Sequence, residues 1–289
     1  MREHPPVVNH TIAGIDVALT GDFALPEELR HLLARCDDPS EITVRLTAAR
    51  GASGLRPDGP PTMETDSWVS FVDERELRIC IKDAGRTPAE VARIDLARDG
   101  LDGRYVYDRD WPYLFQYPTD QLLVTHALGI GGGALIHAAA ITGRDGALLV
   151  AGPSGAGKTT ISRAAAALGA HVLSDERITV RPSAAHGGWV VGGTPWPGDG
   201  GFIENRSVPL KAIILLEQAD DDELVPLSPA RVLALLYRCH FLPVWDPRAC
   251  ERTIDNLERL VRERPAFLYR NKKGPAAAAR LLEFVGGAA

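Results

Sequence analysis

The segment ALLVAGPSGAGKTT, residues 147–160, is the part of the sequence that most constrains how this chain can fold. An apolar run ends at a glycine, a loop of small residues follows, and Lys158, Thr159 and Thr160 open a stretch typical of a helix. Residues 152–159 fit the phosphate-binding pattern G-x-x-x-x-G-K-[ST] at every fixed position. Small residues let successive backbone N–H groups turn inward around phosphate oxygens, and the following helix adds its positive end. The sequence therefore predicts a strand–loop–helix unit that binds a nucleoside triphosphate.

The same loop predicts the donor side of a phosphate site. Lys158 is expected to reach the outer phosphates of ATP, and the hydroxyl of Thr159 is expected to bind Mg²⁺. The predicted nucleotide-binding residues are Gly152, Pro153, Ser154, Gly155, Ala156, Gly157, Lys158, Thr159 and Thr160.

Composition argues against several classes of protein. The chain has 289 residues, 45% of them hydrophobic, which is enough for one large domain or two small ones. Its net charge of −6 gives no electrostatic reason to expect nucleic acid as a partner. The four cysteines lack zinc-binding spacing, the N-terminus lacks the apolar core of a signal peptide, and no apolar run is long enough to cross a membrane. We expect a soluble cytoplasmic protein without a membrane partner.

The pattern of the sequence changes near residue 117. Before that point, alternating apolar residues predict mostly strands, and no helix is long enough to support a parallel α/β sheet. The expected elements are strands at residues 11–19, 42–46, 68–72 and 77–81, a helix at 26–35, and an exposed Gly- and Pro-rich loop at 51–65. We therefore predict a β-rich N-terminal domain over residues 1–116.

The second part mixes helices with apolar strands. The expected strands are residues 134–141, 147–150, 171–173, 189–192 and 212–216, with a hairpin turn at Asp145-Gly146. The expected helices are residues 119–128 with Thr119 as a possible N-cap, the stretch from the loop to residue 168, and residues 229–237, 247–263 and 274–284. The sequence predicts an α/β nucleotide-binding domain over residues 117–289.

A phosphate loop alone does not identify a reaction, because a carboxylate must also help to hold Mg²⁺ and take up a proton. Asp175 and Glu176 directly follow the predicted strand at 171–173 and are the leading candidates. Glu217, which ends the apolar run 212–216, is the competing candidate.

Three further polar residues stand near these elements. His137 interrupts the apolar run 134–141, where a lone histidine is more often a core residue than a ligand. Glu204 and Arg206 follow the Gly-rich stretch 198–201 and form either a surface turn or a charge-neutralising pair at a phosphoryl group.

Residues 134–217 resemble the catalytic domain of bacterial HPr kinase/phosphorylase. Four features match in order: a strand histidine before the loop, the loop form G-x-S-G-x-G-K-[ST], a strand that ends in two acids, and a Glu-x-Arg pair before an apolar strand. In this chain they are His137, the loop GPSGAGKT, Asp175 with Glu176, and Glu204 with Arg206.

The resemblance implies a P-loop kinase domain of the HPr kinase/phosphoenolpyruvate carboxykinase type and ATP-dependent phosphorylation of a serine hydroxyl. It implies that Asp175 takes the hydroxyl proton and that His137 and Arg206 act beside the phosphates. It also implies that Mg²⁺ is bound by Thr159, Glu176 and Glu204. The family often forms oligomers, so a homo-oligomer is possible.

The chain departs from the family at the expected metal position and in its N-terminal part. The second acid of the family is usually Asp, so Glu176 differs, and the first 116 residues do not resemble the N-terminal domain of the family. HPr is therefore not the expected substrate. The leading prediction is a hydroxyl of a peptide or protein, for example a peptide natural-product precursor. The alternatives are a small-molecule hydroxyl such as that of free serine, or an ATP-binding regulatory module without catalysis.

Overall fold

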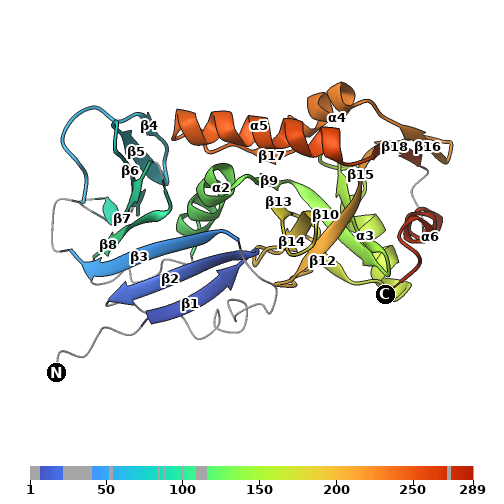
Figure 1. Ribbon diagram of the computed structural model, residues 1–289, viewed down its shortest axis with the longest axis horizontal. Helices are drawn as coiled ribbons and strands as arrows, with labels where there is room; N and C mark the ends of the chain where they lie inside the picture. Colours follow the sequence, from blue (N-terminus) through green and yellow to red (C-terminus); the bar gives the residue numbers. More distant parts are fainter. Residues whose placement is uncertain are drawn as a thin grey trace.

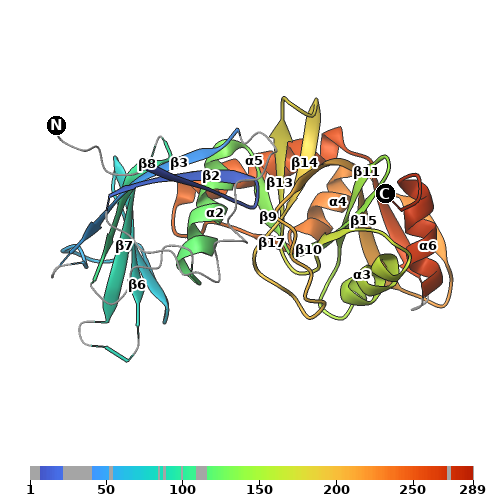
Figure 2. The same ribbon diagram turned by 90° about the horizontal axis from the view of Figure 1, so that it is seen from below.

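The chain forms a mixed α/β structure with two β-sheets built from separate stretches of sequence (Figure 1). The computed structural model describes residues 7–21, 41–51, 55–83, 85–86, 89–98, 100–108, 116–271 and 275–288. The first sheet comes from residues 7–107 and the second from residues 134–271. The two sheets lie beside each other along the long axis of the molecule in both views (Figures 1 and 2).

The first sheet has eight strands in the order β1-β2-β3-β8-β7-β6-β5-β4. The pairs β2–β3 and β3–β8 are parallel, and the other neighbours are antiparallel. Alternate residues of β3 are buried, as a sheet with one covered face requires. The strands are β1 Val7–Ile12, β2 Ile15–Gly21, β3 Thr43–Arg50, β4 Met63–Glu64, β5 Trp68–Val72, β6 Glu76–Lys82, β7 Glu90–Ala97 and β8 Asp102–Tyr107.

The sequence predicted the β character of this part but not all of its strands. The strands expected at 42–46, 68–72 and 77–81 are confirmed. The single strand expected at 11–19 is wrong, because Ala13 and Gly14 adopt positive φ values of 55° and 78° and turn the chain into the β1–β2 hairpin. β7 and β8 were not predicted, and the helix expected at 26–35 lies outside the described residues.

The second sheet has ten strands, eight of them in the order β12-β10-β11-β15-β14-β13-β9-β17, with β18 beside β15 and β16 beside β18. β11, β15 and β18 run parallel, whereas β10 is antiparallel to both β11 and β12. The strands are β9 Ala134–Ile136, β10 Ala138–Gly143, β11 Gly146–Ala151, β12 Val172–Ser174, β13 Ile178–Ser183, β14 Gly188–Gly193, β15 Ser207–Gln218, β16 Glu223–Pro226, β17 His240–Phe241 and β18 Ala266–Asn271.

Helices cover both faces of the central strands. α3 (Lys158–Ala167) and α6 (Pro275–Phe284) pack with Ile141, Leu148 and Val150 on one face. α4 (Pro229–Leu236) and α5 (Pro247–Glu263) pack with Leu149 and Ile213 on the other. All six residues of β10 and of β11 are buried, because apolar side chains are covered on both sides of the sheet.

The helix α2 (Thr119–Gly131) lies between the two sheets (Figure 2). Its leucines share an apolar cluster with strands of the first sheet, and it also packs against α5 and β9. The buried Asp120 at its start accepts a hydrogen bond from Trp196 Nε1 at 2.8 Å. An ion pair of 3.1 Å between Arg98 and the buried Asp246 joins β7's end to the start of α5. In the described part of the chain, no helix combines the length and the apolar character needed to cross a membrane.

The second sheet is interrupted at a corner. Two chain segments, β9–β10 and β12–β13, each stop being a continuous strand there. β9 pairs with β13 and β17, whereas β10 pairs with β11 and β12. His137 is the single residue between β9 and β10, and residues 175–177 separate β12 from β13. The prediction of one strand over residues 134–141 is therefore wrong, and the break places His137 beside the predicted acids.

Most other predictions for this part hold. The helices expected at 119–128, 229–237, 247–263 and 274–284 correspond to α2, α4, α5 and α6, and the hairpin between β10 and β11 is confirmed. Thr119 is the first residue of α2 rather than its N-cap, which is Pro118. β13, β16, β17 and β18 were not predicted.

Candidate active site

The predicted phosphate loop connects the carboxyl end of β11 to the start of α3. Gly155 and Gly157 have φ values of 79° and 104°, where a residue with a Cβ is strained although a Cβ would meet nothing within 4 Å. Backbone conformation, and not crowding, therefore requires glycine at these two positions. Gly157 is the residue before α3, so the helix begins at Lys158 and directs its free N–H groups toward the loop.

Lys158 is buried against the loop. Its Nζ donates hydrogen bonds to the carbonyl oxygens of Gly152 at 2.9 Å and Pro153 at 3.3 Å. Burial lowers the pKa of Lys158, while the nearby Asp175 and Glu176 carboxyl groups act in the opposite direction. No ion pair joins Lys158 to an acid within the described residues, so the ammonium group is held by neutral carbonyls that an anion can replace.

Asp175 lies at the corner between β12 and β13 and is 1% exposed. One carboxylate oxygen, Oδ2, accepts a hydrogen bond from the backbone N–H of Gly200 at 2.9 Å. The other oxygen, Oδ1, is buried and has no hydrogen-bond partner among the described residues. A Cβ at Gly200 would lie 2.6 Å from Oδ2, so glycine lets this loop approach the acid. A buried carboxylate with one oxygen that lacks a hydrogen-bond partner is suited to receive a proton.

His137 and Glu176 meet across the same corner. His137 Nδ1 lies 2.9 Å from the carbonyl oxygen of Glu176 and 3.6 Å from its Oε1. The backbone N–H of His137 donates to the carbonyl of Cys239 at 2.5 Å. Burial and, secondarily, the Lys158 charge lower the pKa of His137. The imidazole is therefore neutral near pH 7, when its Nδ1–H can donate to the Glu176 carbonyl.

A pocket of about 310 Å³ joins the loop to this corner. Its walls contain most of the residues that the sequence predicted for the site, brought together from three separate segments. They are His137, Ser154, Gly155, Gly157, Lys158, Thr159, Thr160, Asp175 and Glu176. Asp199 also lines the pocket and was not predicted. The one sequence signal for Asp199 was an acid inside the Gly-rich stretch 198–201. In the structure, the Arg163 side chain donates a hydrogen bond of 2.5 Å to the backbone carbonyl of Asp199.

Glu204 and Arg206 do not line this pocket. Glu204 contacts His171 Nδ1 at 3.0 Å and Arg206 at 3.3 Å, near the opposite end of β12 from Asp175. The backbone N–H of Glu204 donates to the carbonyl of Leu173. The roles expected for these two residues at the metal and the phosphates remain predictions.

The pocket offers oxygen ligands for Mg²⁺. No group of three His, Cys, Asp or Glu side chains close enough to hold a metal ion occurs among the described residues. Mg²⁺ does not need one, because it commonly binds one or two protein groups together with phosphate oxygens and water. The Thr159 hydroxyl and the Glu176 carboxylate, which both line the pocket, fit that demand.

Comparison with known proteins gives one finding for this region. Residues 119–253 match the family model described as SynChlorMet cassette protein ScmC. The matched stretch begins at α2, ends within α5 and contains every residue that lines the pocket, but not the first sheet. No curated protein shows a significant match to the chain.

Proposed function

We propose that this chain is an ATP-dependent kinase of the HPr-kinase type, which transfers the γ-phosphoryl group to a hydroxyl of a peptide or protein, with serine as the leading candidate. One observation carries the proposal. The lysine and threonine of the predicted phosphate loop share a single pocket with a buried carboxylate, one oxygen of which has no hydrogen-bond partner among the described residues. Phosphoryl transfer needs this combination, because the donor must be held and the acceptor hydroxyl must lose its proton.

The donor side is built from the loop and the first turn of α3. Lys158 exchanges its bonds to the carbonyls of Gly152 and Pro153 for bonds to phosphate oxygens, which gains charge-assisted contacts. Thr159 and Glu176 would hold Mg²⁺, which when bound supplies neutralisation of the charge on the outer phosphates. His137, held by the Glu176 carbonyl, positions that acid at the corner.

The acceptor side is built around Asp175. The acceptor hydroxyl oxygen forms a bond to the γ-phosphorus, the bond from that phosphorus to the bridging oxygen breaks, and ADP leaves. The hydroxyl proton passes to Asp175, for which Oδ1 is available while Gly200 holds Oδ2. The P-loop-kinase fold of the phosphoenolpyruvate carboxykinase type belongs to this proposal, as do ATP and Mg²⁺ as cofactors.

The test is the variant Asp175→Asn, which keeps the shape of the side chain and removes its basicity. We expect unchanged Mg-ATP affinity by calorimetry and a transfer rate lower by roughly 10²–10⁴-fold. Asp145→Asn, in the exposed turn of the β10–β11 hairpin, is the matched control and should retain full activity. Transfer is measured by mass spectrometry of serine-containing peptides, free serine and other small alcohols after incubation with Mg-ATP.

The outcomes separate the alternatives. Undiminished transfer by Asp175→Asn would remove Asp175 from the mechanism. Phosphorylated serine or another small alcohol, without phosphopeptide, would identify a small-molecule kinase. Tight Mg-ATP binding without any phosphorylated product would identify a regulatory module that binds ATP and transfers nothing.

A further inference from the structure

A second pocket, of about 410 Å³, lies on the other flank of the phosphate loop. It is lined by residues 152–156 of the loop, by the carboxyl end of β15 and by the region of α4. Ser154 and Gly155 line both this pocket and the one that contains Asp175. The two cavities therefore meet over the loop.

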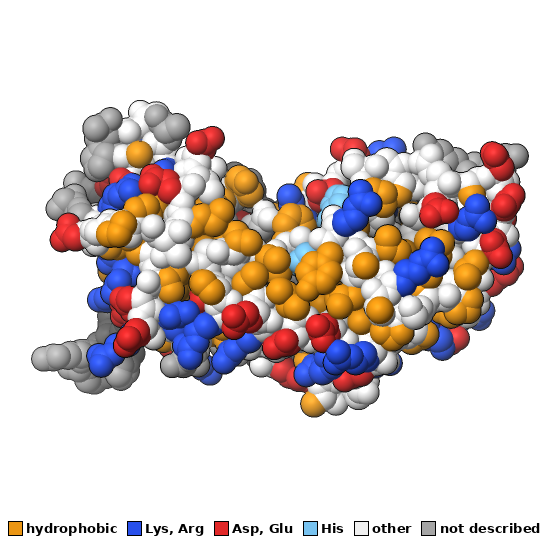
Figure 3. Space-filling view, turned by 90° about the horizontal axis from the view of Figure 1, so that it is seen from above, with side chains coloured by type: hydrophobic (Ala, Val, Ile, Leu, Met, Phe, Trp, Pro, Cys, Tyr) orange, Lys and Arg blue, Asp and Glu red, His pale blue; other side chains and the backbone are white. Residues whose placement is uncertain are grey.

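The chemical character of the second pocket differs from that of the first. Its floor is apolar and is formed mainly by Leu215, Leu216, Leu235, Leu268 and Cys239. Two exposed arginines, Arg231 and Arg238, stand at its rim. On the face of the molecule where α4 and α5 lie, hydrophobic and basic side chains are interspersed (Figure 3).

The two rim arginines carry charge that the described part of the protein does not neutralise. Neither guanidinium group of Arg231 or Arg238 makes a hydrogen bond or ion pair within the part of the chain that the structure describes. Glu217, the acid in the same lining, is paired with Arg270 at 3.2 Å. An apolar floor under unpaired guanidinium groups favours a flat aromatic ring attached to an anionic tail.

The order of the strands shows on which side of the loop each pocket lies. β11 carries the loop, with β10 and β12 on one side and β15 and β18 on the other. Asp175 stands on the β12 side, whereas the second pocket stands on the side of β15 and β18. A nucleoside triphosphate on the loop must bring its terminal phosphate to the Asp175 side, which leaves the opposite side for its nucleoside.

Gln218 attaches this second pocket to the phosphate loop. It is the last residue of β15, and its side-chain Nε2 donates a hydrogen bond to the carbonyl of Gly155. The wall of the pocket is thereby fixed relative to the residues that would hold the phosphates.

We infer that the second pocket binds the nucleoside moiety of the phosphoryl donor, with the base on the apolar floor and Arg231 and Arg238 packed against it. The inference rests on the proposed function, because it assumes a nucleoside triphosphate on the loop. It also assigns the acceptor a direction of approach, since the hydroxyl must then reach Asp175 from the side away from α4.

The experiment compares two ligands that share their phosphates. The affinities of Mg-ATP and of magnesium with inorganic triphosphate are measured by calorimetry for the native protein and for the double variant Arg231→Ala/Arg238→Ala. We expect the double variant to bind ATP about tenfold more weakly and inorganic triphosphate with unchanged affinity. Arg262→Ala, which removes an exposed arginine of α5 paired with Glu258, is the control and should change neither affinity.

A second variant guards against an indirect effect of losing two charges. Leu235→Trp fills the apolar floor without changing charge and should also weaken ATP binding selectively, while circular dichroism shows a retained fold. Equal losses for ATP and inorganic triphosphate, or no loss for ATP in either variant, would overturn the assignment of the pocket.

The failure of this inference differs from the failure of the proposed function. If the protein is an active kinase and neither variant changes its affinity for ATP, the nucleoside pocket is wrong and the proposed kinase function remains. If the variants lose ATP affinity selectively but the protein phosphorylates no acceptor, the nucleoside pocket is supported and the proposed kinase function is wrong. A native protein that binds neither ATP nor inorganic triphosphate overturns both.

Discussion

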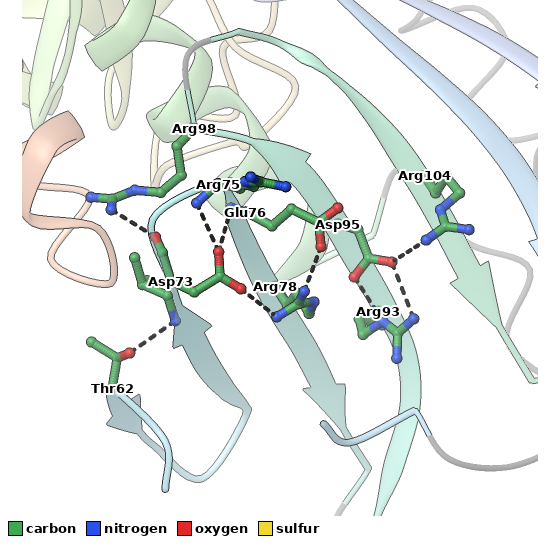
Figure 4. A network of polar contacts seen from close by, with 10 residues as sticks. Thr62, Asp73, Arg75, Glu76, Arg78, Arg93, Asp95, Arg98 and Arg104 are labelled. Carbon is green, nitrogen blue, oxygen red and sulfur yellow. Dashed lines mark hydrogen bonds and ion pairs between the residues drawn. The ribbon is translucent and has the colours of Figure 1, made fainter. Parts of the chain in front are cut away.

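The first sheet and the corner of the second sheet differ in how their charged side chains are paired. On the first sheet, acids and bases pair with one another along a strand, at its turn or, as for Arg104 and Asp95, between neighbouring strands (Figure 4). Arg78 contacts Asp73 at 3.0 Å and Glu76 at 2.5 Å, and Arg93 contacts Asp95 at 2.7 Å. These ion pairs neutralise the charged side chains that form them.

At the corner of the second sheet, charges are kept apart. Lys158 is held by two carbonyl oxygens, and Oδ1 of Asp175 has no partner among the described residues, although both line one pocket. Buried charged groups without a partner are costly and gather at functional sites. The comparison shows that the number of charges does not mark the candidate site. The charged groups that the fold leaves without an oppositely charged partner do.

The strongest test of this contrast replaces one lysine in each region. On the proposed function, Lys158→Met should lower the efficiency of phosphoryl transfer by about 100-fold or more, because the cation proposed to bind the phosphates is lost. Lys82→Met removes the lysine that pairs with Glu64 at 2.5 Å on the first sheet, and should leave transfer unchanged. Steady-state kinetics with the acceptor found by mass spectrometry measure both variants, and similar losses would erase the contrast.

The next effect concerns a titratable group buried without partners. His126 of α2 is 0% exposed, neither ring nitrogen has a hydrogen-bond partner among the described residues, and burial lowers its pKa from 6.5 to about 4. Between these values the unfolded state binds more protons, so the free energy of unfolding falls as pH falls from 6.5 toward 4. The loss approaches roughly 3 kcal/mol at the low end.

Urea denaturation at several pH values measures this dependence. His126→Gln should flatten the slope between pH 6.5 and 4, whereas His171→Gln, at an exposed histidine paired with Glu204, should preserve it. An unaltered slope in His126→Gln would show that the buried imidazole is not the source.

A third test compares two buried tryptophans. Trp196→Phe removes the 2.8 Å hydrogen bond to Asp120, whose pKa is already raised by burial, and leaves a buried carboxylate oxygen without its donor. We expect a loss of about 1–3 kcal/mol in the free energy of unfolding. Trp245→Phe is the matched control, because Trp245 Nε1 is buried without a partner among the described residues. Thermal or urea unfolding should show the smaller loss for Trp245→Phe, and the reverse order would contradict the argument.

The smallest effect is expected on the first sheet. Arg78→Ala breaks two ion pairs on a solvated surface and should cost less than about 1 kcal/mol, with the cost shrinking as salt is added. Denaturation at low and high ionic strength measures it. A loss well above this, or a change in phosphoryl transfer, would mean that the paired surface does more than neutralise itself.

Local sequence patterns predicted those features that depend on neighbours along the chain. The phosphate loop, the hairpin before it and the helix after it follow from glycine conformations and apolar periodicity over a few residues. The same locality explains the confirmed strands of the first sheet and helices α4 and α5. Local reading missed the turn at Ala13, because a short apolar run looks alike in one strand or in a hairpin.

The sequence by itself determined that the chain carries the pattern G-x-x-x-x-G-K-[ST] between a strand and a helix, and that two acids follow it. Only the tertiary structure decided which residues share the pocket. The apolar run around His137 breaks because its two halves pair with different strands, and this long-range pairing leaves no local signature. The same reason placed Asp199 inside the pocket and Glu204 outside it, since each position depends on how distant segments pack.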